Sequence, residues 1–100
     1  MNLEFLLPAA DEFKEAIDWY ALRSPRAREG FRAVVHDAIS KAMARPTSAG
    51  FLAGKRVRKI RLTPYSYGLL YFVHQETLYI VAVAHNHRRP RYWQDRLDEL

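Results

Sequence analysis

The spacing of apolar residues changes several times along this chain, and each change marks the boundary of a predicted element. Near the N-terminus Leu3, Phe5 and Leu7 alternate with residues 2, 4 and 6, which predicts a first strand that Pro8 closes. From Ala9 to Leu22 apolar residues recur every three or four positions among charged ones, which predicts a helix. The apolar positions of this helix are Phe13, Ala16, Ile17 and Tyr20.

A second helix follows almost without a loop. Ser24 and Pro25 have the residue types of an N-cap and a first helical position, and Arg45-Pro46 stops the helix. So short a connection predicts an antiparallel helical hairpin. Gly30 lies inside this helix, where it marks close packing or is simply tolerated. The apolar stripe of the helix consists of Phe31, Val34, Val35, Ala38, Ile39 and Ala42.

The second half of the chain has the patterns of strands. In the segment 56–62, Ile60 and Leu62 are predicted to face the core, so that Lys59 and Arg61 point outward together. The segments 67–73 and 78–85 form a predicted hairpin, and residues 78–84 carry no charge, which is typical of a central strand covered on both faces. Between the second helix and these strands, residues 46–54 form a loop by composition, with Phe51 and Leu52 expected on the core. At the end of the chain Trp93, Leu97 and Leu100 have the spacing of a short C-terminal helix.

These elements predict an α+β fold in the order β-α-α-β-β-β. We expect an antiparallel sheet with the helical hairpin packed on one face and a short C-terminal helix. One hundred residues correspond to a single domain, residues 1–100.

The composition limits the chemistry of the protein. The chain has no cysteine, which excludes disulfides, thiolate metal sites and a cysteine nucleophile. No apolar run approaches the roughly 18 residues that span a bilayer, and no leader pattern stands at the N-terminus, so we expect no membrane association and a cytoplasmic location. His85 and His87 have no adjacent acidic third ligand, so we expect neither a metal nor another cofactor.

The positive charge is concentrated in the second half of the chain. The formal net charge is +5, and residues 55–100 hold nine Lys and Arg against four Asp and Glu. Such an excess favours an acidic partner, either nucleic acid or an acidic protein.

Cations and rings follow the predicted central strand. Arg88, Arg89 and Arg91 stand beside Tyr92 and Trp93, a combination that binds phosphates and bases or grips a protein surface. Trp93 has a second interpretation as a core residue. His85 at the strand end is either a titrating group ready to accept a proton or a residue that positions the last loop.

Several short motifs follow one another along the chain: residues 15–20, Phe31, Arg45-Pro46, residues 57–60, Pro64-Tyr65, residues 70–72, residues 82–85, Arg88, Pro90 and Trp93. Taken in this order, they resemble the RelE/ParE superfamily of toxins, and more closely its ParE or plasmid stabilisation branch. The resemblance implies the toxin of a type II toxin–antitoxin module, with a cognate antitoxin as its partner.

The superfamily supports two unlike activities, and the resemblance does not choose between them. RelE-type members cleave mRNA on the ribosome with clustered cations. Lys59, Arg61 and Arg88 match that pattern, with His85 as an additional acid or base. Tyr92 lies near the C-terminal tyrosine of RelE-type members, but a third-strand arginine of the cluster falls on Gly68. This missing cation counts against a ribonuclease.

ParE-type members inhibit DNA gyrase without a recognised catalytic site of their own, and their C-terminal region is implicated in that action. We therefore favour inhibition of gyrase by binding, with mRNA cleavage and a non-toxic binding module as alternatives, and leave open whether the protein is an enzyme. The expected target-binding residues are Arg58, Arg88, Arg89, Tyr92, Trp93 and Arg96. For the antitoxin, Trp19, Tyr20 and Leu22 are expected to provide apolar anchors.

Overall fold

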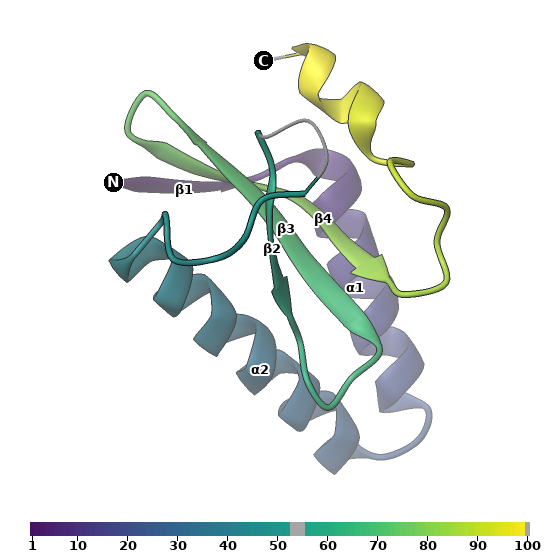
Figure 1. The fold of residues 1–100 in the computed structure, drawn as a ribbon. Helices are drawn as coiled ribbons and strands as arrows, with labels where there is room; N and C mark the ends of the chain where they lie inside the picture. Colours follow the sequence, from purple (N-terminus) through teal and green to yellow (C-terminus); the bar gives the residue numbers. More distant parts are fainter. Residues whose placement is uncertain (53–55, 100) are drawn as a thin grey trace.

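The computed structural model describes residues 1–52 and 56–99, and Figure 1 shows their arrangement. The fold is α+β in the predicted order, with four strands, two helices and a short C-terminal 3-10 helix. The elements are β1 (Asn2–Phe5), α1 (Leu7–Ala21), α2 (Pro25–Ala44), β2 (Arg58–Arg61), β3 (Tyr67–His74), β4 (Thr77–His85) and η1 (Gln94–Glu99).

The sheet has the strand order β1-β4-β3-β2, so β4 is an interior strand as predicted. The β2–β3 and β3–β4 pairs are antiparallel, but β1 runs parallel to β4, with Phe5 opposite Ile80. The expectation of a fully antiparallel sheet is therefore wrong at this one edge. The alternation of apolar residues in residues 3–7 indicated a strand and its faces, but such alternation carries no information about direction.

Both faces of the sheet are covered. On one face the helices pack on a cluster that includes Phe31, Leu69, Tyr71 and Ile80. On the other face Trp93 and Leu97 of the C-terminal segment cover the remaining apolar residues, which include Leu70, Phe72, Val81 and Ala82. The uncharged sequence of β4 follows from this two-sided burial.

The ends of the helices follow local chemistry. Ser24 caps α2, because its hydroxyl oxygen accepts a hydrogen bond from the backbone N–H of Ala27 at 2.9 Å. α1 begins at Leu7, two residues earlier than predicted, and includes Pro8 in its first turn.

Gly30 marks close packing. A methyl group at this position would run into the hydroxyl of Tyr65. Tyr65 in turn packs edge-on against Phe31, with ring centroids 5.3 Å apart. The missing side chain therefore lets the turn between β2 and β3 approach α2.

The loop between α2 and β2 was expected to pack on the core through Phe51 and Leu52, and this is wrong for Phe51. Phe51 is 52% exposed and packs on Arg58 instead of the core. Leu52 does contact the core, on the face of the sheet that Trp93 and Leu97 cover. The last residues of the predicted 46–54 loop and Leu100 lie outside the described residues.

Candidate functional site

A buried carboxylate organises the end of the chain. Among the described residues Glu12 is the one buried charged side chain, and it lies on α1 facing β4. Its oxygens accept hydrogen bonds from the backbone N–H of Val83 at 3.1 Å, from the Tyr92 hydroxyl at 2.6 Å and from Arg96 at 2.8 and 2.9 Å. We call Glu12, Tyr92 and Arg96 the Glu12 cluster.

Within the Glu12 cluster the negative charge of Glu12 is paired with the positive charge of Arg96. The Arg96 guanidinium also donates to the carbonyl of Val81 at 2.9 Å, and the hydrogen bond to Glu12 raises the pKa of Arg96. Burial, and then the hydrogen bond to Glu12, raise the pKa of the Tyr92 phenol well above its ordinary value, so the phenol stays a donor. α1, β4 and the C-terminal segment are thus joined at one point.

The loop between β4 and η1 presents cations above this cluster. Arg88 is 54% exposed, lies over the Tyr92 ring at 4.6 Å and approaches Glu12 at 3.8 Å. Arg89 and Arg91 are exposed, and Arg91 has a left-handed backbone with φ 63°. A non-glycine residue in that region is strained by about 1 kcal/mol or more, and such strain is concentrated at functional sites.

The other residues that were expected to bind the target are buried or already bonded within the protein. Trp93 is 6% exposed and belongs to the core, which is its second interpretation from sequence. The Arg96 side chain is 15% exposed and paired with Glu12. Arg58 donates to the carbonyls of Thr47 and Ala49, at 3.2 and 2.6 Å, and so holds the loop after α2. Of the six, Arg88 and Arg89 are exposed for a target.

The four candidate ribonuclease residues do not converge. Lys59 pairs with Leu70 and Arg61 with Gly68, so both side chains leave β2 on the face that carries Leu70, and Arg61 also lines a hollow with Ala33 and Asp37 of α2. His85 pairs with Tyr67, whose ring packs with the helices, so His85 lies on the opposite face. The Lys59 methylenes fill the space above Gly68, because a Cβ on Gly68 would lie 2.6 Å from Lys59 Cε. Lys59 and Arg61 line a separate hollow of about 280 Å³.

His85 and Arg88 line a hollow of about 210 Å³ together with Trp19 and Glu15. We call it the Trp19 pocket. His85 Nδ1 accepts a hydrogen bond from the backbone N–H of His87 at 3.1 Å, a contact that positions the last loop. The structure therefore brings together Trp19, expected to bind the antitoxin, Arg88, expected to bind the target, and His85, which was a candidate only for the ribonuclease alternative.

The expected antitoxin anchors differ in accessibility. Trp19 is 47% exposed and Leu22 is 83% exposed, and the Arg23 guanidinium lies 3.3 Å above the Trp19 ring. Tyr20 is half-buried against Phe31, with ring centroids 5.0 Å apart, and burial raises the pKa of its phenol. An apolar patch with a cation at its edge is thus open at the end of α1.

Sequence reasoning missed Glu12, because it stands among the polar residues between the apolar positions of the first helix. The available signal was its spacing, since Glu12 follows Ala9 by three positions and precedes Ala16 by four, which places it on the buried face. Its partners come from residues 83–96, which no local pattern could reveal.

The described residues contain no group of three or more His, Asp or Glu side chains placed to hold a metal ion. In the same part of the chain, neither helix is long and apolar enough to span a bilayer.

The comparisons with known proteins identify the family to which this α+β fold belongs. A family model described as "ParE toxin of type II toxin-antitoxin system, parDE" matches residues 3–90. Because this match covers most of the chain, the protein belongs to the ParE toxin family, which confirms the resemblance seen in its sequence.

The fold is also that of a solved structure described as "Chromosomal ParDE TA system from P. aeruginosa". The matching chain is 17% identical with a TM-score of 0.63, and the match covers 85% of this protein and 95% of that chain. A sequence search of curated proteins finds no match.

We expect Glu12→Ala to lower the free energy of unfolding by about 3–5 kcal/mol, because it leaves Arg96 buried without its counter-ion. Urea denaturation measures the change. Asp18→Ala on the same helix is the control, since Asp18 is exposed and its removal should change stability by less than about 0.5 kcal/mol. A Glu12→Ala protein as stable as the control would contradict the role of the cluster.

We also expect stability to fall at alkaline pH. Burial is the first cause that raises the pKa of Tyr20, Tyr67, Tyr71 and Tyr92 in the folded protein. The unfolded chain releases these protons near the ordinary pKa of 10.0 while the folded chain retains them. Stability is therefore fully present below about pH 10 and decreases above it. Tyr92→Phe should flatten this decrease in urea titrations between about pH 8 and 11, and an unchanged slope would contradict the assignment.

Proposed function

We propose that this protein is the toxin of a type II toxin–antitoxin module, that a cognate antitoxin holds it inactive, and that the free toxin inhibits DNA gyrase by binding. The observation that carries this proposal is the Trp19 pocket, where Trp19, His85 and Arg88 lie side by side. Membership of the ParE family supports the toxin and its module.

Action by binding is supported by the placement of the cations. A phosphoryl-transfer site needs its charges aimed at one reacting group. Lys59 and Arg61 line one hollow and His85 and Arg88 line another, so the four candidates are not gathered around one site. Arg88, Arg89 and Arg91 instead project from a loop that the Glu12 cluster fixes in place, which suits a docking surface.

The same geometry supports a simple mechanism of neutralisation. An antitoxin segment that uses Trp19 and Leu22 as apolar anchors extends over the Trp19 pocket and covers Arg88. Antitoxin and target then compete for one surface. Neutralisation requires no conformational change in the toxin under this mechanism.

The double variant Arg88→Ala, Arg89→Ala tests the target surface. We expect it to require at least about tenfold more protein to inhibit gyrase supercoiling, because interface arginines often contribute about 2 kcal/mol or more. Arg26→Ala with Arg32→Ala removes the same charge from the exposed face of α2 and should inhibit like the wild type. Equal inhibition by the wild type and both double variants would contradict the assignment of Arg88 and Arg89 to the target surface.

An mRNA-programmed translation extract, run beside the supercoiling assay, separates the two activities. Normal supercoiling together with cleaved mRNA would refute inhibition of gyrase and establish the ribonuclease alternative.

Leu22→Ser tests the antitoxin surface. Leu22 is 83% exposed, so its substitution should leave the stability of the toxin unchanged. We expect the affinity for the cognate antitoxin, measured by calorimetry, to fall about tenfold, because an apolar anchor is lost. The matched control is Leu7→Ser at the other end of α1, where Leu7 is 81% exposed. Equal affinity of the two variants for the antitoxin would contradict the assignment of this surface to the antitoxin.

A further inference from the structure

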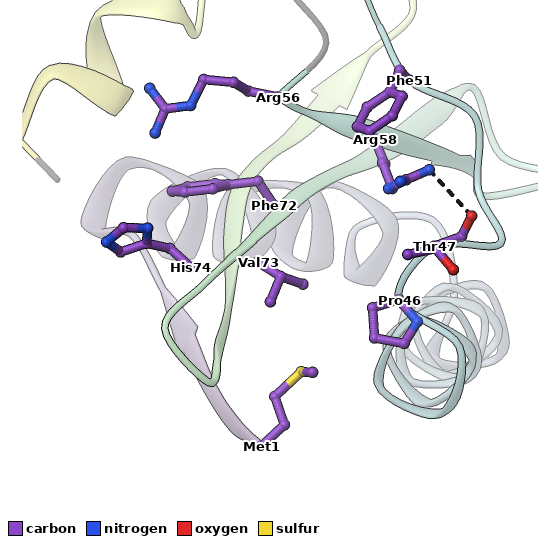
Figure 2. A pocket seen from close by; sticks show the side chains of 9 residues that line it. All are labelled: Met1, Pro46, Thr47, Phe51, Arg56, Arg58, Phe72, Val73 and His74. Carbon is purple, nitrogen blue, oxygen red and sulfur yellow. Dashed lines mark hydrogen bonds between the residues drawn. The ribbon is translucent and has the colours of Figure 1, made fainter.

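A third hollow lies at the far end of β3 from the Trp19 pocket. It has a volume of about 380 Å³, and Figure 2 shows it between the end of β3 and the loop after α2. We call it the β3-end pocket. It is lined by Met1, Pro46, Thr47, Phe51, Arg56, Arg58, Phe72, Val73 and His74.

One wall of the β3-end pocket is fixed by hydrogen bonds. Arg58 donates to the carbonyls of Thr47 and Ala49, and the ring of Phe51 covers its guanidinium at 3.7 Å. The Tyr71 hydroxyl donates to the carbonyl of Pro46 at 2.7 Å. These contacts hold the loop on the sheet, so the pocket is formed before any partner arrives, which lowers the entropy lost on binding.

The pocket combines exposed apolar surface with positive charge. Met1, Phe51 and Val73 are 51%, 52% and 42% exposed, and they make up three of the large apolar side chains left open in the described part of the chain. The Arg56 guanidinium lies 5.3 Å from the centre of the Phe72 ring. Figure 2 shows the two side chains next to each other at the edge of the pocket.

Arg56 forms no ion pair with any side chain that the structure describes, and no Asp or Glu is among the described lining residues of the pocket. The Arg56 guanidinium lies over the Phe72 ring, and Phe72 is itself stacked on Tyr79 with ring centroids 5.3 Å apart. The N–H groups of the Arg56 guanidinium are therefore available beside the apolar side chains of the pocket.

We propose that the β3-end pocket is a docking site for a short acidic segment of a protein partner, in which a carboxylate pairs with Arg56 and an apolar side chain packs between Phe51 and Val73. Charge complementarity selects this occupant, since the pocket has cations and no carboxylate among its described lining residues. A nucleic acid is disfavoured because tight binding to it needs several free cations along a backbone, and Arg58 is already committed to the loop.

This site is separate from the proposed target surface. Val73 and His74 end β3, whereas Tyr67 begins it next to His85, about 23 Å away at the rise of a strand. The proposal therefore does not depend on the proposed function. It is tested without gyrase or antitoxin.

The probe is a short synthetic peptide of alternating Glu and Leu, titrated into the ¹⁵N-labelled protein and followed by amide chemical shifts. We expect changes at Phe51, Val73, His74 and Thr47, and none at residues 88–91. Replacing every Glu of the peptide by Gln, or every Leu by Ser, should weaken binding at least about tenfold, since each removes one half of the recognition.

Arg56→Glu should also weaken binding of the Glu–Leu peptide at least about tenfold. Arg26→Glu is the matched control, because Arg26 is exposed on α2, lies outside the pocket and changes the net charge equally. Well-dispersed amide spectra establish that both variants are folded. Val73→Ser gives a second test that leaves the net charge unchanged, with a loss of about threefold.

Four results would overturn the proposal. The shifts could map to residues 88–91, or Arg56→Glu and Arg26→Glu could weaken binding equally, which would mean that the peptide responds to net charge alone. A short single-stranded DNA could shift the pocket amides where the peptide does not, which would identify a nucleic-acid site. Shifts of these amides on dilution of the protein alone would identify a second copy of this chain as the occupant.

Discussion

The buried carboxylate of Glu12 is the interaction on which the arrangement of this protein depends. Removing a carboxylate from water carries a penalty of several kcal/mol, which is offset only when its oxygens are well paired. Here four hydrogen bonds meet at the two oxygens, and they come from β4, Tyr92 and Arg96. Because these donors are far from Glu12 in sequence, the carboxylate fixes the path of the last part of the chain across the sheet.

That path has two consequences. Trp93 and Leu97 are brought onto the second face of the sheet, which completes the core with residues that would otherwise be solvent-exposed. The short loop before them runs from β4 to Tyr92, which is bound to Glu12, so Arg88, Arg89 and Arg91 lie on a loop that is anchored at both ends. A docking surface made of arginine needs such support, because ordering a long free side chain at an interface costs about 1 kcal/mol.

The arrangement also separates two kinds of exposed surface. The end of α1 places Trp19 beside Arg88, so the surfaces that we propose for the antitoxin and for the target meet there. The opposite end of β3 presents Arg56 beside open apolar residues. Each surface joins apolar side chains with arginine, and Glu12 and Glu15 also line the Trp19 pocket.

Most of the fold was predictable, because the spacing of apolar residues along each segment indicates whether the segment is a helix or a strand. The uncharged run in β4 indicated burial on both faces, and the alternation in β2 placed Lys59 and Arg61 outward together. The parallel direction of β1 was not predictable, since alternation is the same in either direction. The site was only partly predictable. Arg88 and Trp19 stand out by residue type, but which arginines are free depends on Glu12, Thr47 and Ala49, and those contacts are distant in sequence.

We propose above all that the loop held by the Glu12 cluster is the surface through which the free toxin acts. Hydrogen–deuterium exchange of the toxin, alone and bound to DNA gyrase, tests this proposal most directly. We expect slower exchange at residues 86–92 in the complex and unchanged exchange at residues 46–51. Unchanged exchange at residues 86–92, or protection confined to another surface, would contradict it.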